Sequence, residues 1–207
     1  MKLVQRFMRF FFHLLYHPFA FTYDLVAAVV SFGNWKDWVF SILPFIEGTR
    51  ILELGHGPGH LQRLLHDRGL SPVAIDESPQ MGGVAKRRLG NSRKLARALA
   101  EQLPFSEKSF DTIISTFPTS YIFQEQTLSE VKRCLSDSGR LIVLPVAFPK
   151  SGFLKWLYKI TGESPADLTE SIEERSLQPF LNAGFHAEVE IVEVKSSRLL
   201  IIIAAKK

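Results

Sequence analysis

Runs of apolar residues separated by polar turns divide the chain into short strands and longer helices. Apolar runs predict strands over residues 51–54 and 73–76, with a helix between them. Toward the other end of the chain, a helix over residues 172–183 precedes two further apolar segments, 187–194 and 198–204. Strands that alternate with helices in this way predict an α/β fold on a largely parallel sheet.

The two C-terminal segments predict an antiparallel hairpin. Only Lys195-Ser196-Ser197 separates them, and Gly184 suits the C-cap of the preceding helix. The stretch Leu199–Ala205 is apolar throughout, as expected for a central strand that is buried on both faces. We therefore expect this hairpin to close the sheet.

The most distinctive segment links the first strand to its helix. Glycines stand at every second position, Gly55, Gly57 and Gly59, where the backbone can turn sharply and approach a ligand closely. The helix that follows presents free N–H groups, which favour a negatively charged group. Glu53 ends the first strand and Asp76 ends the second. An acid in the second position can accept hydrogen bonds from both hydroxyls of a ribose, so these features predict a nucleotide-like cofactor.

The spacing of the glycines separates two cofactor classes. Dinucleotide enzymes use Gly-x-Gly-x-x-Gly, whereas residues 55–59 read Gly-x-Gly-x-Gly with an acid two positions upstream. That pattern resembles motif I of the class I S-adenosylmethionine-dependent methyltransferases. Segments 98–105 and 109–114 resemble the family's adenine-walling loop and fourth strand, and 130–144 resembles its next helix, turn and fifth strand. The likeness is greatest to the methyltransferase type 11 branch, which includes ubiquinone/menaquinone-biosynthesis C-methyltransferases.

The resemblance implies a fold, a cofactor and a set of contacts. The expected fold class is α/β and Rossmann-like: a seven-stranded, mostly parallel sheet with a C-terminal antiparallel hairpin and helices on both faces. The expected reaction is methyl transfer from S-adenosylmethionine, which leaves S-adenosylhomocysteine. The residues that the resemblance assigns to cofactor binding are Glu53, Gly55, His56, Gly57, Gly59, Asp76, Glu77, Met81, Ala100, Glu101 and Thr116.

The chain departs from the family at Leu99, where many relatives carry the acid that meets the adenine amino group. Because leucine cannot accept that hydrogen bond, adenine has to be held by packing and backbone groups, with Ala100 and Glu101 nearest. Met81 offers a soft, polarizable surface for the adenine face. Alternatively, Met81 is a core residue at the start of the next helix. The resemblance favours the cofactor role.

In the family, residues after the fourth strand face the transferred methyl group, so we expect residues 115–121 to line the acceptor pocket. The segment lacks the Asn/Asp-Pro-Pro-Tyr signature of amino methyltransferases, which argues against a nucleobase or glutamine acceptor. Its aromatic side chains favour a small hydrophobic acceptor, lipid-like or quinone-like. The residues predicted for this pocket are Phe117, Pro118, Tyr121, Phe148 and Trp156, with Phe153 beside them.

Methyl transfer from a sulfonium depends mainly on alignment and needs no dedicated catalytic side chain. An aromatic or phenolic acceptor would still benefit from a base, and the candidates are His60, Tyr23 and Tyr121, with His56 nearby. His60 is predicted at the start of a helix, where the positive end of the helix dipole disfavours the charged imidazole and leaves a neutral ring that can accept a proton. For both histidines, loop structure or a cofactor contact is the simpler interpretation. Tyr23 either closes over the cofactor or packs as an ordinary helical tyrosine.

The N-terminus carries a second pattern. Basic residues and histidines recur every three or four positions over residues 1–17 among Phe and Leu, which predicts a basic amphipathic helix that ends before Pro18. Arginines interrupt every apolar run, so neither a membrane span nor a signal peptide fits. The helix suits a membrane surface, and it suits equally packing on the core or on another chain. We expect a cytoplasmic protein, peripheral at the membrane if this helix binds there.

The patterns divide the chain into two parts. Residues 1–47 are expected to form N-terminal amphipathic and lid helices, and residues 48–207 the methyltransferase domain. An insertion at about 147–168 follows the fifth strand, at the carboxyl end of the sheet where ligands bind. Trp35 and Trp38 share a helix face, which is more typical of core than of a substrate platform.

Composition and charge argue against several other classes of function. Basic residues number 25 against 21 acidic ones, and no basic patch with interleaved aromatics predicts nucleic-acid binding. The single cysteine, Cys134, stands at apolar spacing in a predicted helix, so we expect a core thiol. No Cys/His cluster has metal-site spacing. Two rival functions are a nicotinamide oxidoreductase, whose glycine spacing is absent, and a non-catalytic methyltransferase-like module that binds through its N-terminal helix.

Overall fold

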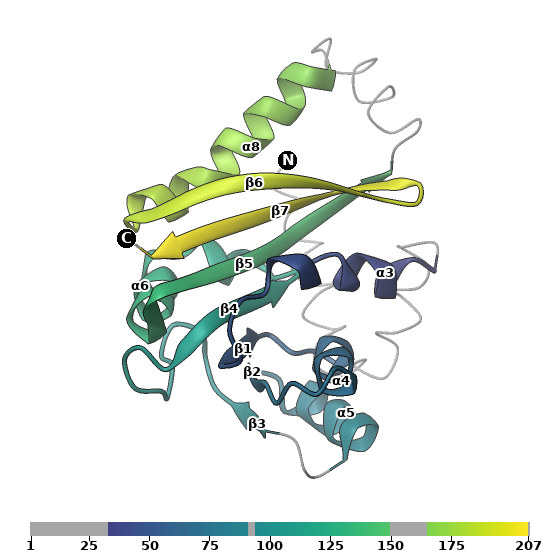
Figure 1. Cartoon of the computed structure of the whole chain (residues 1–207), viewed down its shortest axis with the longest axis vertical. Helices are drawn as coiled ribbons and strands as arrows, with labels where there is room; N and C mark the ends of the chain where they lie inside the picture. Colours follow the sequence, from purple (N-terminus) through teal and green to yellow (C-terminus); the bar gives the residue numbers. More distant parts are fainter. Residues whose placement is uncertain (1–32, 91–93, 150–164, 207) are drawn as a thin grey trace, which may run out of the picture.

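The computed structural model describes residues 33–90, 94–149 and 165–206, which form a single mixed sheet with helices around it (Figure 1). The seven strands are β1 (Ile51–Leu54), β2 (Val73–Asp76), β3 (Lys94–Arg97), β4 (Phe110–Thr116), β5 (Leu135–Pro149), β6 (Phe185–Val194) and β7 (Ser197–Lys206). Their order in the sheet is β3-β2-β1-β4-β5-β7-β6. The first five run parallel, and β7 pairs antiparallel with β5 and β6. The predicted Rossmann-like α/β fold is confirmed.

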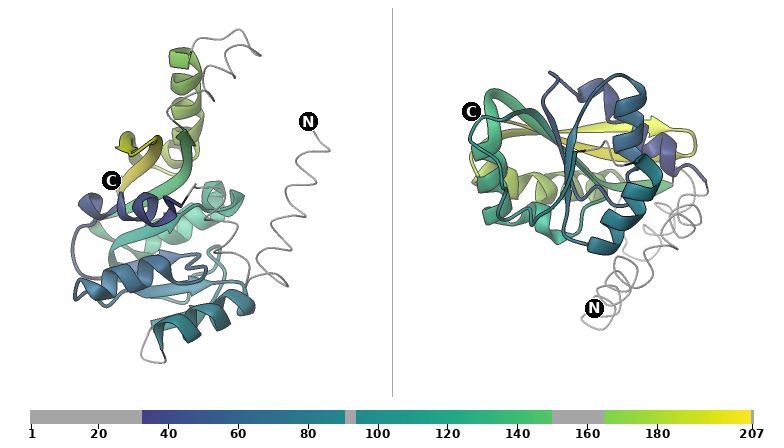
Figure 2. Two further views of the ribbon diagram at one scale, coloured as in Figure 1. Left: turned by 90° about the vertical axis from the view of Figure 1, so that its right-hand side faces the viewer. Right: turned by 90° about the horizontal axis from the view of Figure 1, so that it is seen from below.

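Helices cover both faces of the sheet (Figure 2). They are α3 (Trp35–Phe40), η2 (Leu43–Phe45), α4 (His60–Asp67), α5 (Pro79–Leu89), η3 (Ser120–Phe123), α6 (Glu125–Cys134) and α8 (Pro165–Asn182). One apolar cluster joins the sheet to α3 and α4, and a second joins it to α6 and α8. The remaining long helix, α5, packs on β2 and β3.

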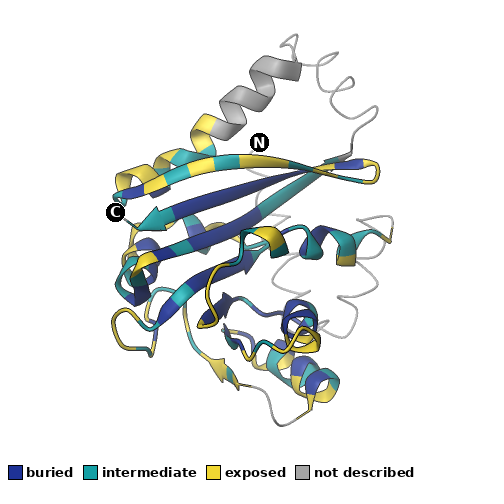
Figure 3. Cartoon of the chain, viewed as in Figure 1, coloured by how far each residue is buried: buried dark blue, intermediate teal, exposed yellow. Residues whose placement is uncertain are grey.

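Strand β7 connects the two apolar clusters. Its side chains alternate between the faces, so Leu199 and Ile201 join the α3/α4 cluster while Leu200 and Ile202 join the α6/α8 cluster. These side chains are buried, and the strand is dark blue along most of its length in Figure 3. Each such side chain contributes about 1.5–3 kcal/mol relative to exposure. Strand β7 is an interior strand, one place in from the edge strand β6, and its burial on both faces agrees with the prediction.

The C-terminal hairpin has a two-residue loop. Val194 pairs with Ser197, and Lys195 between them takes the left-handed conformation with φ +51°. Gly184, which follows α8, also has a positive φ of +77° and donates its N–H to the Leu181 carbonyl at 2.9 Å. A left-handed residue directly after a helix satisfies a terminal carbonyl, as expected of a glycine C-cap.

Strand β5 is longer than the sequence predicts. It begins directly after α6, where the resemblance over residues 130–144 implies a turn between the helix and the strand. Phe110 pairs with Leu135 and Thr112 with Arg140, so residues 136–139 bulge outward at a single position of β4. At its other end β5 continues to Pro149, still paired with β7. Regular pairing therefore reaches past residue 147, where the sequence predicts an insertion.

The described part of the N-terminal region belongs to the same core. Trp38, Val39 and Ile42 are buried against the sheet, and Asp37 forms an ion pair with Lys195 at the hairpin tip. The predicted amphipathic helix over 1–17, Tyr23, Phe153 and Trp156 lie outside the described residues. Within residues 33–90, 94–149 and 165–206, no helix combines the length and apolar character needed to cross a bilayer.

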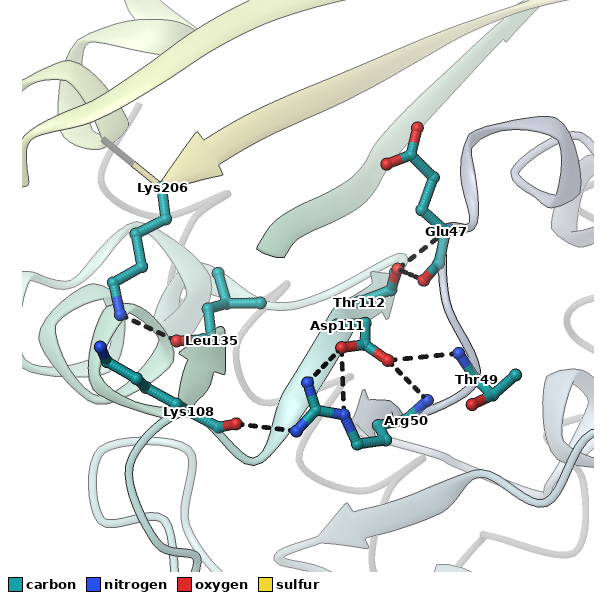
Figure 4. A network of polar contacts seen from close by, with 8 residues as sticks. All are labelled: Glu47, Thr49, Arg50, Lys108, Asp111, Thr112, Leu135 and Lys206. Carbon is teal, nitrogen blue, oxygen red and sulfur yellow. Dashed lines mark hydrogen bonds and ion pairs between the residues drawn. The ribbon is translucent and has the colours of Figure 1, made fainter. Parts of the chain in front are cut away.

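A polar network fixes β1 beside β4 at their amino ends (Figure 4). Asp111 accepts hydrogen bonds from the backbone N–H of Thr49 at 3.2 Å and of Arg50 at 3.1 Å. The Arg50 guanidinium also donates to Asp111, which lowers the pKa of that carboxyl. Thr112 Oγ1 accepts from the Glu47 N–H at 3.1 Å. These contacts hold the two strands whose opposite ends form the pocket described next.

Candidate functional site

A pocket of about 240 Å³ opens at the carboxyl ends of β1, β2 and β4. Strand β1 lies between β2 and β4, where the order of strands in the sheet reverses, and ligands of open α/β sheets bind at such a point. The lining residues come from strand ends and the loops after them. They are Gly55, Gly57, Ile75, Asp76, Glu77, Ser78, Ala98, Leu99, Ala100, Glu101, Thr116, Phe117, Pro118, Thr119, Ser120, Tyr121 and Gln124.

The glycine loop after β1 depends on close backbone approaches. Gly55 has φ +72°, and a Cβ there would lie 2.9 Å from Tyr121 Oη. Gly59, the N-cap of α4, has φ +84°, and its Cβ would lie 2.7 Å from Leu89 Cδ1 on α5. At both positions the left-handed backbone disfavours a side chain, which would also have to displace the tip of its neighbour. The loop is also tied to β2, because the N–H of Gly55 donates to the Ile75 carbonyl at 2.9 Å.

Asp76, at the end of β2, lines the pocket. Its Oδ2 accepts the Gly57 N–H at 2.8 Å, and its Oδ1 accepts the Ser78 N–H at 2.8 Å. A carboxylate has about four lone-pair sites, so each oxygen keeps one site for a further donor. Two acceptor sites on one carboxylate match the two hydroxyl donors of a ribose.

Glu53 is buried beneath this loop, with 1% of its surface exposed. Its Oε2 accepts a hydrogen bond from Gln62 Nε2 on α4 at 2.8 Å. Burial raises the pKa of Glu53 to about 8; the Gln62 hydrogen bond opposes the rise, and the charge of Asp76 adds to it. Near neutral pH this carboxyl is therefore largely protonated and can donate as well as accept.

The wall formed after β3 is largely apolar. Ala98, Leu99 and Ala100 line it, and 51% of the Leu99 surface is exposed. An exposed leucine beside small residues offers a surface on which a flat heterocycle can lie, without a hydrogen bond to its edge. Glu101 is the carboxylate of this wall.

The opposite wall follows β4. Tyr121 holds its hydroxyl 3.1 Å from the Leu54 carbonyl and 2.8 Å from Ser115 Oγ, so the ring is anchored to the end of β1. Phe117 has φ +50° and packs on Trp35 with 4.2 Å between ring centroids. Aromatic and small polar side chains thus share this side of the pocket.

Thr119 and Ser120 of the predicted segment 115–121 line the pocket, as do ten individually predicted site residues. They are Gly55, Gly57, Asp76, Glu77, Ala100, Glu101, Thr116, Phe117, Pro118 and Tyr121. Six other described candidates do not line it: Glu53, His56, Gly59, His60, Met81 and Phe148. The roles of all these residues toward a cofactor or acceptor stay predictions, as do those of Tyr23 and Trp156.

Some candidates outside the lining have other contacts. His60 receives a hydrogen bond from Arg88 Nη1, 3.1 Å from its Nε2. His56 is buried, and its Nδ1 donates to the Gly57 carbonyl at 2.7 Å. Met81 is fully buried in the first turn of α5, and Phe148 pairs within the β5–β7 ladder. Among the described candidates for a base, Tyr121 is the one that lines the pocket.

Sequence reasoning missed several lining residues. Ile75 faces the pocket from within β2, and Ser78 lines it as the N-cap of α5, accepting the Met81 N–H at 3.2 Å. A Ser-Pro step before a helix signals such a cap. Gln124 reaches the pocket from the start of α6, and no local pattern marks it. In the described part of the chain, no three His, Cys, Asp or Glu side chains group as metal ligands do.

Comparison with known proteins adds to the geometry. A profile described as "Methyltransferase domain" matches residues 52–143. The ubiquinone/menaquinone biosynthesis C-methyltransferase of Blochmanniella floridana is 28% identical over 159 residues, which cover 70% of this chain and 62% of that protein. The demethylmenaquinone methyltransferase of Thermus thermophilus is 31% identical over 147 residues, 67% of each chain. The chain thus spans less than two thirds of the Blochmanniella relative.

Solved structures share the architecture. An S-adenosylmethionine-dependent methyltransferase from Thermotoga maritima has a TM-score of 0.64 and 19% identity, covering 94% of this chain and 99% of that chain. Phosphoethanolamine N-methyltransferase 2 of Haemonchus contortus, in complex with S-adenosyl-L-methionine, has a TM-score of 0.60 and 17% identity, covering 84% and 53%. At these identities the likeness concerns the fold.

Proposed function

Because the chain belongs to the class I S-adenosylmethionine-dependent methyltransferases, we propose that it transfers a methyl group from S-adenosylmethionine to a small, hydrophobic, quinone-type acceptor. The observation that carries the proposal is the pocket at the ends of β1, β2 and β4. It combines a glycine loop with a carboxylate, Asp76, that keeps two acceptor sites.

The residues present fit this cofactor. Asp76 would hold the ribose hydroxyls, the Gly55–Gly59 loop would lie against the amino-acid end, and Leu99 and Ala100 would pack on the adenine. Glu101 follows Ala100 in the chain and is the carboxylate beside this apolar wall. When bound, the cofactor supplies a methyl group that is already activated by a positively charged sulfur. The protein then has to orient the acceptor and exclude water, and positioning can contribute about 7–11 kcal/mol.

The acceptor class rests on the wall after β4 and on the relatives. Phe117, Pro118 and Tyr121 give this wall an aromatic and apolar character that suits a planar hydrophobic ring. Relatives at 28–31% identity are named for ubiquinone, menaquinone or demethylmenaquinone. Tyr121 is our candidate for a proton acceptor near such a ring, since its hydroxyl is held in a fixed position.

A quinone-type acceptor with a lipid tail resides in a membrane. We therefore keep the proposal that residues 1–17 bind the membrane surface peripherally, with the methyltransferase domain on the cytoplasmic side. Its support is the spacing of basic and aromatic residues in that segment.

A methyl-transfer assay tests the proposed function. The full chain is incubated with S-adenosylmethionine and either a short-chain naphthoquinol that lacks the ring methyl group, or polar amine and catechol acceptors. We expect S-adenosylhomocysteine to form with the naphthoquinol, together with a product that has gained one methyl group by mass spectrometry. Turnover only with the polar acceptors would overturn the acceptor class. Failure of the folded protein to bind the cofactor would favour the non-catalytic module instead.

A further inference from the structure

Phe117 has an unusual backbone for a bulky side chain. It follows directly after β4 with φ +50°, in the left-handed region that glycine and asparagine adopt more readily. Its N–H still donates to the Leu144 carbonyl at 2.7 Å, so the β4–β5 ladder holds the backbone in place. Strained residues of this kind persist where their surroundings fix them, and they gather at ligand sites.

The residues that pack on the Phe117 ring come from α3. The Trp35 ring packs on the Phe117 ring with 4.2 Å between centroids and an angle of 31° between planes. Trp38 lies 6.0 Å from the same ring and is itself buried. Helix α3 is held in turn by its packing on α4 and by the Asp37–Lys195 ion pair. Phe117 therefore contacts a fixed aromatic surface and also lines the pocket.

We propose that Trp35 is a positioning residue, which holds Phe117 as a flat aromatic wall for a planar acceptor ring and so makes α3 part of the acceptor site. The inference rests on the proposed function and deepens it. Aromatic rings prefer offset or edge-to-face contacts with other rings, so a fixed phenyl ring favours a planar acceptor over an aliphatic one.

Ordinary core packing is the alternative explanation of the Trp35–Phe117 contact. Packing alone does not require the left-handed backbone, because a residue with negative φ could place an apolar side chain against α3 without that strain. A glycine would relieve the strain but would leave Trp35 without its partner ring. The combination of strain, stacking and pocket lining at one residue favours a role toward the ligand.

The test measures acceptor binding separately from cofactor binding. The full chain is saturated with S-adenosylhomocysteine and titrated calorimetrically with a soluble short-chain naphthoquinone. We expect Trp35→Ala to weaken naphthoquinone binding about threefold to tenfold, the size of one lost aromatic contact. Its affinity for S-adenosylhomocysteine should stay unchanged. Trp35→Phe keeps a ring and should restore most of the naphthoquinone affinity.

Two further variants separate positioning from stability. Phe117→Gly removes the wall and should weaken naphthoquinone binding at least as much as Trp35→Ala does. The lost ring packing outweighs the relief of left-handed strain, so its melting temperature should fall as well. Phe40→Ala removes an aromatic ring from the same helix that is not stacked on Phe117, and it should lower stability without changing naphthoquinone affinity.

Each outcome decides the inference. Equal effects of Trp35→Ala and Phe40→Ala on naphthoquinone affinity would overturn it in favour of plain packing, as would unchanged affinity in Trp35→Ala. A wild-type protein that binds S-adenosylhomocysteine but not the naphthoquinone would overturn the acceptor class and the wall together. A wild-type protein that binds neither would overturn the proposed function itself.

Discussion

The backbone N–H of Gly57 donates to Oδ2 of Asp76 across 2.8 Å, which ties the glycine loop after β1 to the end of β2. The same carboxylate accepts the Ser78 N–H at the start of α5. Asp76 therefore has two tasks: it shapes the loop, and it keeps acceptor sites that face the pocket.

The contribution of Asp76 to the shape of the glycine loop should be measurable in the ligand-free protein. We expect Asp76→Ala to lower the free energy of unfolding by about 1–2 kcal/mol, because two backbone N–H groups lose their acceptor. Urea denaturation of the ligand-free protein measures this. Asp76→Asn keeps one side-chain oxygen, so its free energy of unfolding should lie between those of the wild type and Asp76→Ala. Unchanged stability in Asp76→Ala would show that the loop does not depend on the carboxylate.

The exposed leucine in the pocket leads to a gain-of-affinity prediction. Leu99→Asp introduces the carboxylate that many members of the family carry at this position, and we expect it to tighten binding of S-adenosylhomocysteine about threefold to tenfold. The analogue with inosine in place of adenosine lacks the amino donor and serves as the control. An equal gain for both ligands would mean that the new carboxylate does not meet the adenine edge.

Burial of Glu53 makes stability depend on pH. Its pKa is raised from 4.5 to about 8, so the folded state holds its proton more tightly than the unfolded state. The resulting stabilisation is fully present below pH 4.5 and is lost as the pH rises through about 8. In the ligand-free protein we expect wild-type stability to fall relative to Glu53→Gln over this range, on the order of a few kcal/mol. Parallel pH profiles from urea denaturation of the two proteins would contradict the burial of a titrating carboxyl.

The single cysteine gives a direct probe of the core. Cys134 is fully buried at the end of α6, and burial raises the pKa of its thiol. Since the thiolate is the reactive form, we expect the folded protein to resist a disulfide-exchange reagent such as Ellman's reagent at mildly alkaline pH. The thiol should react stoichiometrically in denaturant. Rapid reaction of the folded protein would contradict the predicted core position.

Elements whose residues show a strong local pattern could be predicted from the sequence. Strand β2 has the predicted bounds, α4 starts one residue before Leu61, and the apolar run in β7 lies in an interior strand, between β5 and β6. Gly55, Gly57 and Asp76 meet in one pocket, because the carboxyl ends of parallel strands share an edge. These features depend on local composition or on general rules of α/β folds.

Features set by distant contacts escaped prediction. Strand β3 reads Lys94-Leu95-Ala96-Arg97, with no apolar alternation, and it forms by pairing with β2. The bulge over 136–139 contains turn-forming residues and yet lies in β5, since both of its flanks pair with β4. The left-handed Phe117 could not be foreseen either, because its conformation depends on the ladder with Leu144 and on the rings of α3. Long-range pairing overrides local preference in each case.

Calorimetric titration with S-adenosylmethionine and S-adenosylhomocysteine tests the central claim most directly. We predict saturable binding of both ligands to the wild-type protein and a loss of at least about tenfold in Asp76→Ala, which removes a charged acceptor of hydrogen bonds. Asp137→Ala, which removes an exposed carboxylate of β5 outside the pocket lining, should bind as the wild type does. A folded wild-type protein that binds neither ligand would contradict the account.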